Sequence, residues 1–447
     1  MQEDSEYFLK SKLTALTEEN KELQKKLNAK RYKLADKVVD GAYRIIPKHK
    51  KAIDSSASRL EKYSNYSGSN RIDIINHNFY DWDGNILYKG GAERYVYDLA
   101  ILLTRLGYKP RILQGANHSF EKDYRGISVI GVPAKCGDYR GLSKIFNKFC
   151  EGSDLIIASP TELASEITST PCIAINHGVN FDGPWTDINF SPIGQYRIYT
   201  DALENVESCI CVDTNFINWI RTKDYRLSKK LVYIPNYYDK KIFRLAKKRN
   251  KGEDITFVLS YPRRIYEPRG YDITIEAFRN ILRDFKNVKL RFVGQIDNDK
   301  VRCDIDGILS EFPKRVSRTE YSMDEAYKAY DGADVVLVPT KYSEGTSLSC
   351  IEAQAMGIPV IATDIGGLPD LIIDHFNGIL ISPSARSLEN AVRELLQSPE
   401  LIDTLGKNAY NVARSSFTKE RWNSRWSNEI TYCIENIKSK VNNNCEN

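Results

Sequence analysis

Short apolar segments alternate with amphipathic helical segments from residue 71 onward, and this alternation constrains the fold more than any other feature. The segment RIDIIN at residues 71–76 predicts a buried strand, and residues 90–107 follow it with the periodicity of a helix that ends at Gly107. Further short segments rich in β-branched residues include ISVIGV, DLIIAS and PCIAIN, and helical stretches separate several of them. Strands joined by helices form parallel sheets covered on both faces, so an α/β, doubly wound fold is expected.

The alternation starts a second time after a basic, polar stretch. Residues 244–254, RLAKKRNKGED, have the composition of a linker between domains, and ITFVLS, KLRFVGQ and DVVLVPT then resume the strand pattern. The sequence therefore predicts two Rossmann-like domains, at residues 71–245 and 253–400. C-terminal helices at residues 401–447 are expected to pack back on the first domain. Two such domains facing each other form a cleft at the carboxyl ends of their strands, where ligands bind.

Residues 1–40 follow a different pattern. Leucines recur there with alternating steps of four and three, and Glu and Lys flank them. Asn20 occupies one of the seam positions, where a single Asn favours two strands. We expect residues 5–35 to form a coiled coil that makes a homodimer, although a lone amphipathic helix docked on the chain's own body fits the same pattern. Residues 41–70, rich in Ser and Asn toward their end, predict a linker.

The bulk composition is that of a globular protein, with 42% hydrophobic residues, 28% charged residues and a net charge of +5. The nine cysteines form no CxxC pair, the N-terminus is polar, and no apolar run reaches the roughly 20 residues of a membrane span. We therefore expect a cytoplasmic protein. The segment GLSKIFNKF at residues 141–149 fits either a helix packed on its sheet or a peripheral contact with a membrane.

The stretch YSEGTSLSCIEAQAMGIPVIATDIGG, at residues 342–367, carries the strongest site pattern. Glu344 follows the strand DVVLVPT, and a helix is expected to begin near Thr346 or Ser347, both suitable caps. The positive end of that helix suits a diphosphate. Glu352 lies roughly 8 Å farther along the helix axis. Carboxylates on either side of a phosphate site suit a nucleotide sugar, which has hydroxyl groups on both sides of its diphosphate.

Other candidate residues lie on loops after predicted strands. Arg264 and Arg269 can make bidentate bonds to phosphate oxygens and neutralise a leaving diphosphate without a metal ion. Gly90 and Gly91 begin the first helix, where glycine lets the backbone approach a phosphate closely, although a Gly-Gly pair is more often only a turn. His177 follows the strand PCIAIN, and a lone histidine is more often structural than functional.

No metal site and no nucleic-acid site is expected. The chain lacks zinc-ligand spacing and a concentrated basic face with interleaved aromatic residues. Asp-x-Asp triplets mark the metal site of some enzymes, but a motif that occurs three times in one chain is not specific. The triplets are Asp81/Asp83, Asp297/Asp299 and Asp304/Asp306.

Together, and in this order, the motifs of residues 71–430 resemble the retaining GT-B glycosyltransferases of family 4, the glycosyl transferases group 1. Each motif alone is only suggestive, whereas the full series is specific. The residues that match the motifs of that family are Gly90, Gly91, Glu93, His177, Asn236, Asp239, Arg264, Arg269, Gly270, Glu344 and Glu352.

The resemblance implies roles for these residues. Glu344 would hold the hydroxyl groups of the donor sugar, and Glu352 would hold the ribose. Arg264 and Arg269 would stabilise the departing diphosphate, and His177 would touch the sugar near the reacting centre. Backbone N–H groups for the donor would come from Gly345, Thr346, Ser347 and Leu348.

The resemblance implies retaining transfer of a hexosyl or deoxyhexosyl group from a nucleotide sugar, which is a co-substrate, with no metal or other cofactor. The acceptor would be a saccharide or a lipid-linked saccharide, in the synthesis of a bacterial surface polysaccharide such as lipopolysaccharide or capsule. Arg269 stands where the family has lysine, Tyr237 where it has glycine and Thr346 where an aromatic residue is common, so the donor stays open. Two alternatives remain: a catalytically idle scaffold subunit, and a sugar-nucleotide epimerase or phosphorylase on the same fold.

Overall fold

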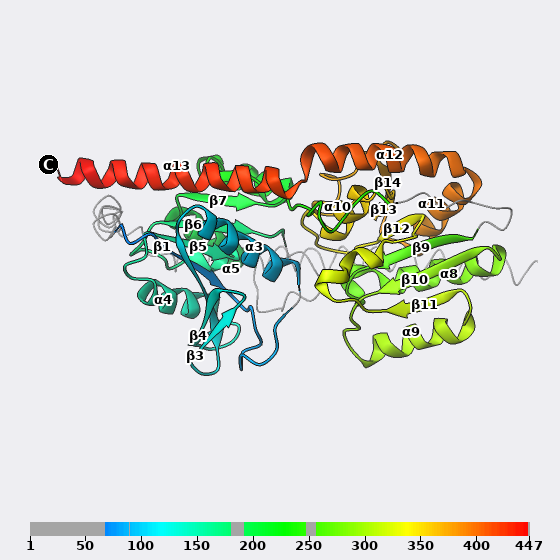
Figure 1. The fold of residues 1–447 in the computed structure, drawn as a ribbon, viewed down its shortest axis with the longest axis horizontal. Coiled ribbons are helices and arrows are strands. Elements are labelled where there is room, and N and C mark those ends of the chain that lie inside the picture. The colour runs from blue at the N-terminus through cyan, green and yellow to red at the C-terminus, as the bar shows by residue number, and fades with distance from the viewer. Residues whose placement is uncertain (1–67, 89, 180–191, 247–255, 446–447) are drawn as a thin grey trace, which may run out of the picture. The chain divides into compact units, whose positions relative to one another are not determined.

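The computed structural model describes residues 68–88, 90–179, 192–246 and 256–445 (Figure 1). These residues fall within one compact unit. The expected coiled coil at residues 5–35 and nearly all of the expected linker at residues 41–70 lie outside the described residues. The coil and the homodimer therefore stay predictions.

The first domain is built on an eight-stranded sheet with the order β3-β4-β2-β1-β5-β6-β7-β8. Neighbouring strands run parallel, except that β3 runs antiparallel to β4. The register places Ile74 of β1 beside Ile112 of β2 and Ile157 of β5, so β-branched side chains fill the centre of the sheet. The strands are β1 (Arg71–Asn76), β2 (Lys109–Ala116), β3 (Phe120–Tyr124), β4 (Ile127–Pro133), β5 (Leu155–Ser159), β6 (Cys172–Asn176), β7 (Ser208–Cys211) and β8 (Leu231–Tyr233).

Helices cover both faces of this sheet (Figure 1). Within the segment that fitted either sheet packing or a membrane contact, Leu142 and Phe146 are buried in the core and Ile145 packs against it, while Phe149 is exposed. Most of that apolar face therefore packs on the sheet. The helices of this domain are α3 (Gly91–Arg105), α4 (Tyr139–Phe149), η1 (Thr161–Ala164), α5 (Pro192–Asn205), α6 (Thr214–Lys223) and α7 (Tyr225–Ser228).

The second domain is built on a six-stranded parallel sheet with the order β11-β10-β9-β12-β13-β14. Its strands are β9 (Phe257–Pro262), β10 (Val288–Val293), β11 (Val316–Thr319), β12 (Val335–Val338), β13 (Val360–Thr363) and β14 (Gly378–Ile381). Its helices are η2 (Glu267–Arg269), α8 (Tyr271–Asp284), α9 (Asp299–Glu311), η3 (Met323–Ala329), α10 (Leu348–Ala355) and α11 (Ala385–Gln397). Strand order changes direction at β9 and β12, and ligands of such sheets bind beyond the carboxyl ends of the strands at that point.

The two C-terminal helices belong to different domains (Figure 1). In α12 (Pro399–Ser416), Ile402 and Leu405 are part of the core of the second domain. In α13 (Lys419–Cys445), Trp422 and Trp426 are buried in the core of the first domain. None of the helices in the described ranges is long and apolar enough to cross a membrane.

Candidate functional site

Glu344 lies in the loop between β12 and α10, at the centre of a polar cluster. Its Oε2 accepts a hydrogen bond from Arg263 (2.5 Å), another from the hydroxyl of Thr340 (2.8 Å), and a third from Arg269. Burial opposes the charge of this carboxyl group, but the two guanidinium groups outweigh it and hold its pKa below the usual value. Glu344 is therefore an ionised carboxylate held in one orientation.

Arg263, and not Arg264, is the partner of Arg269 at this carboxylate. Arg264 instead bonds to Asp297 (2.6 Å), and its side chain is 60% exposed, whereas that of Arg263 is 6% exposed. The two adjacent arginine side chains therefore lie in different surroundings, and only that of Arg263 contacts Glu344. The expected position of Arg264 at the site is wrong by one residue.

The turn that leads into α10 is packed closely against the first domain. A Cβ on Gly345 would lie 2.5 Å from the carbonyl oxygen of His177, so a larger residue would separate these backbones. The hydroxyl of Thr346 donates to the carbonyl of Val212 (2.9 Å) and accepts from the N–H of Asn236 (3.0 Å). Thr346 therefore ties the site to the first domain, and its side chain is already engaged.

Helix α10 begins at Leu348, close to the expected start. Ser347 occupies the N-cap position and is buried, but in the described structure its side chain makes no capping hydrogen bond. The first N–H groups of a helix have no partner within the helix, and the positive end of its dipole attracts anions. The N-terminus of α10, next to Glu344, thus offers donors suited to a phosphate group.

Glu352 lies in α10 and contacts both domains. Its Oε1 accepts from Nη2 of Arg94 (2.7 Å), a residue of α3, and its Oε2 accepts from the hydroxyl of Tyr330 (2.5 Å). A Cβ on Gly91, the first residue of α3, would lie 2.8 Å from Leu348. Of the two expected glycines, Gly91 therefore lies beside the N-terminus of α10, whereas a Cβ on Gly90 would meet the side chain of Glu93.

His177 follows β6 and is held by neighbours in the first domain. Its Nε2 lies 2.9 Å from the hydroxyl oxygen of Ser159, and its ring meets that of Tyr95 edge-on at 5.2 Å between centroids. Burial lowers its pKa to about 4, so the imidazole is neutral at pH 7. In this state His177 can form hydrogen bonds but carries no charge.

Asp213, at the carboxyl end of β7, was not identified from the sequence. Its Oδ1 caps α6 by accepting from the N–H groups of Asn215 (2.9 Å) and Phe216 (3.2 Å). Its Oδ2 is buried and has no hydrogen-bond partner among the described residues. Burial raises its pKa to about 6, helped by the nearby charges of Asp370 and Glu344. An Asp before a helical segment is a recognisable cap signal, and it could have drawn attention to Asp213. The proximity of Asp213 to Glu344 could not be predicted from the sequence.

The structure thus brings together Glu344 with Arg269, His177 with Gly345, and Gly91 with Leu348. Arg263, Arg94 and Tyr330 join them, and no sequence pattern singled these three out. Over the described ranges, no group of three or more His, Cys, Asp or Glu residues could hold a metal ion. In two of the Asp-x-Asp triplets, Asp297 pairs with Arg264 and Asp304 accepts from Tyr271.

Comparison with protein families gives a match over residues 241–412 to the glycosyl transferases group 1. The chain is 27% identical over 339 residues to an uncharacterized glycosyltransferase of Methanocaldococcus jannaschii, an alignment that covers 73% of this chain and 90% of that protein. It is also 26% identical over 179 residues to the capsular polysaccharide biosynthesis glycosyltransferase CapM of Staphylococcus aureus, over 40% of this chain and 46% of that protein.

Two solved structures show the same architecture. Sucrose-phosphate synthase from Thermosynechococcus elongatus has a TM-score of 0.66 and 20% identity, covering 82% of this chain and 99% of that one. HepE from Anabaena, solved in complex with UDP, has a TM-score of 0.64 and 17% identity, covering 81% and 100%. These likenesses confirm the expected fold, GT-B, with two Rossmann-like domains.

Proposed function

Residues 241–412 match the glycosyl transferases group 1, and we propose that the chain is a retaining, metal-independent enzyme of this family that moves a sugar from a nucleoside-diphosphate donor to a saccharide acceptor. One observation carries the proposal. Glu344 is fixed by Arg263 and Arg269 at the N-terminus of α10, and Glu352 lies in the same helix. The donor would lie across that N-terminus, with its sugar at Glu344 and its ribose at Glu352.

The diphosphate would lie against Arg263 and Arg269. Both guanidinium groups are held in place by Glu344. Two fixed positive groups stabilise the negative charge that develops on the diphosphate as it leaves. Arginine also presents paired N–H groups that match phosphate oxygens. This electrostatic arrangement gives the leaving group its stabilisation without assigning that role to a metal ion.

The transfer would take place on one face of the sugar. The bond between the anomeric carbon and the phosphate oxygen breaks, the acceptor oxygen bonds to the same face of that carbon, and the acceptor proton passes to the departing phosphate. The neutral imidazole of His177 would form a hydrogen bond to the sugar near this centre. No protein carboxylate is needed as a base, which agrees with Glu344 being held in ion pairs.

The relatives suggest where to look for the substrates. HepE was solved with UDP, so UDP-hexoses and UDP-deoxyhexoses are the first donors to try. CapM belongs to capsular polysaccharide biosynthesis, which supports a role in making a bacterial surface polysaccharide on a saccharide or lipid-linked saccharide acceptor. Such a protein would work in the cytoplasm or at the inner face of the cell membrane.

The test is the stereochemistry of the product in the presence of EDTA. The purified full chain is incubated with a nucleotide sugar and candidate acceptors, and NMR gives the anomeric configuration of the new linkage. We expect the configuration of the donor to be retained and the rate to be unchanged by EDTA. An inverted product, or activity that depends on added metal, would contradict the proposal. A chain that binds the donor but transfers nothing to any acceptor would favour the idle scaffold.

A further inference from the structure

We propose that Arg94 and Tyr330 are positioning residues that fix the two oxygens of Glu352, so that the ribose of the nucleotide is recognised through a contact between the two Rossmann-like domains. This inference rests on the proposed function, because it concerns the same donor site. It means that nucleotide binding by the second domain depends on a residue of the first domain. Part of the recognition of the nucleotide would come from α3 of the first domain.

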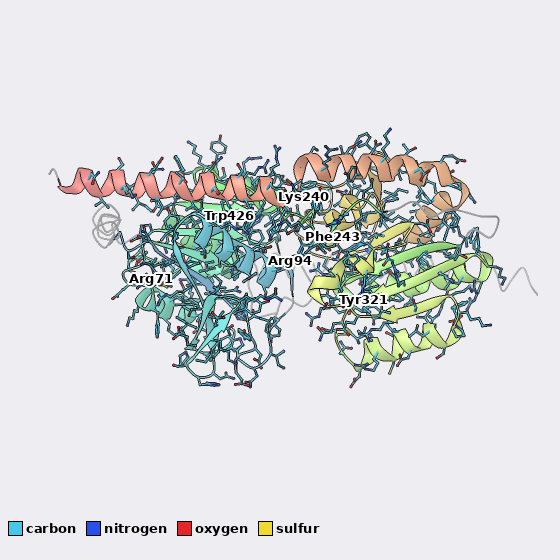
Figure 2. All side chains as sticks on the ribbon, viewed as in Figure 1. Arg71, Arg94, Lys240, Phe243, Tyr321 and Trp426 are labelled. Carbon is cyan, nitrogen blue, oxygen red and sulfur yellow. The ribbon has the colours of Figure 1, made fainter. Side chains whose placement is uncertain are left out.

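The geometry fixes Glu352 from two sides. Arg94, which is labelled in Figure 2, donates to Oε1 at 2.7 Å. Tyr330 donates to Oε2 at 2.5 Å. The Glu352 side chain is only 7% exposed. A carboxylate has about four sites that can accept hydrogen bonds. With one partner on each oxygen, Glu352 keeps accepting capacity on both, which suits the two neighbouring hydroxyl groups of a ribose.

Arg94 reaches this carboxylate because of where α3 begins. Its backbone N–H bonds to the carbonyl of Gly90 (3.3 Å) in the first turn, and that turn lies against Leu348 of α10. Burial alone would lower the pKa of the Arg94 guanidinium, but the Glu352 carboxylate raises it. The guanidinium is therefore charged, and the contact is an ion pair between the domains.

Removal of Arg94 would change the state of Glu352 and not only its surroundings. A buried carboxylate that loses its cationic partner becomes costly to keep ionised. Without Arg94, nothing would hold Oε1 of Glu352 from the side of the first domain, and the carboxylate would no longer be fixed for a ribose. Loss of the Tyr330 hydroxyl would remove the hydrogen bond to Oε2 of Glu352, which comes from the second domain. Loss of Arg94 and loss of Tyr330 should therefore both reduce the preference for ribose.

The test compares ribose with dideoxyribose. Isothermal titration calorimetry on the full chain uses UDP, GDP and ADP, each beside its 2′,3′-dideoxy counterpart. For the base that binds, we expect the wild-type chain to prefer the ribose form by about tenfold or more, the size of a hydrogen bond to a charged group. We expect Arg94→Met, Tyr330→Phe and Glu352→Gln each to reduce this preference to less than about threefold. Arg94→Lys keeps the charge and should restore part of it.

Arg105→Met is the matched control, because Arg105 is an exposed residue in the last turn of the same helix. It should keep the wild-type preference. If Arg94→Met folds and still prefers ribose as strongly as wild type, the inference is overturned. Tighter binding of the ribose nucleotide by Arg94→Met would also overturn it, because Arg94 would then be blocking the site. If Arg94→Met fails to fold, Tyr330→Phe decides by the same ratio.

Failure of the proposed function has a different signature. In that case the wild-type chain binds none of the three nucleoside diphosphates and does not bind dTDP either, and both proposals fall together. Failure of this inference alone leaves wild-type binding intact, with a ribose preference that does not depend on Arg94 or Tyr330.

Discussion

At the scale of single residues, two adjacent arginines show how much a site depends on side-chain direction. Arg263 and Arg264 are the same residue type, but the side chain of Arg263 is buried against Glu344 and that of Arg264 is exposed beside Asp297. The spacing of charged residues singled out the loop that contacts Glu344. It could not identify the residue, because the direction of each side chain depends on how the chain leaves β9.

We therefore propose for Arg263 the role that was expected for Arg264. We predict that Arg263→Ala reduces kcat of sugar transfer by about 100-fold to 1000-fold, as loss of a group that stabilises developing charge does. Arg264→Ala, which alters an exposed ion pair, should stay within about threefold of wild type. Steady-state kinetics on both purified variants gives the comparison. Equal losses of kcat in the two variants would show that Arg263, which bonds to Glu344, does not act on the diphosphate.

Asp213 gives a prediction of pH dependence. Its pKa is raised to about 6 in the folded chain, above the ordinary value of 3.8, because its carboxyl group is buried. Below about pH 4 the group is protonated whether the chain is folded or unfolded. As the pH rises through 6, the unfolded chain loses this proton more easily, so stability falls, by roughly 2–3 kcal/mol in total.

Asp213→Asn should remove this loss while its amide oxygen still caps α6. We predict that the melting temperature of the variant, relative to wild type, rises between pH 4.5 and pH 7.5. The measurement is differential scanning calorimetry over that range, and the difference between variant and wild type cancels the other titrating groups. A difference that stays constant with pH would show that Asp213 has no raised pKa.

At the scale of elements, the strands rich in β-branched residues were predictable and β3 was not. The predicted strands are buried along most of their length, so hydrophobicity alone reveals them. In β3, FEKDY, the exposed residues Glu121 and Asp123 alternate with the half-buried residues Phe120, Lys122 and Tyr124 at the edge of the sheet. That pattern is weak over five residues. The start of α10 was predicted closely, because small polar residues precede an apolar run.

Helix α13 should contribute strongly to the stability of the first domain. Trp426, which is labelled in Figure 2, is fully buried there. Its indole N–H donates to the hydroxyl of Tyr95 at 2.7 Å. We predict that Trp426→Ala lowers the free energy of unfolding by about 3–5 kcal/mol. Tyr432→Ala, at an exposed position of the same helix, should change it by less than about 0.5 kcal/mol. Urea denaturation followed by circular dichroism measures both, and equal effects would mean that α13 is not anchored through Trp426.

At the scale of the whole molecule, the periodicity predicted both domains, whereas their contacts needed the structure. Arg94 with Glu352, and Asn236 with Thr346, join residues more than a hundred positions apart. A single sequence carries no signal for such pairs. The leucine pattern of residues 5–35 is a local signal, and it still predicts a coiled coil.

Deletion of residues 1–40 tests that coil. The truncated chain should be a monomer that keeps hydrolysis of the donor, because the candidate site lies entirely within the two domains. Light scattering coupled to size-exclusion chromatography gives the mass of both forms. A truncated chain that is still a dimer would show that the leucine seam does not cause association.

The central claim is that a nucleotide sugar binds at Glu344 and the N-terminus of α10, and a thermal-shift panel tests it most directly. UDP-, GDP-, ADP- and dTDP-sugars are added without metal to the wild-type chain and to Glu344→Gln. At about 100 times its dissociation constant, a ligand stabilises the folded state by roughly 2.7 kcal/mol. The account predicts that one nucleotide series raises the melting temperature of the wild-type chain and has less effect on the variant. A folded wild-type chain that responds to none of them, or a variant that responds equally, would contradict it.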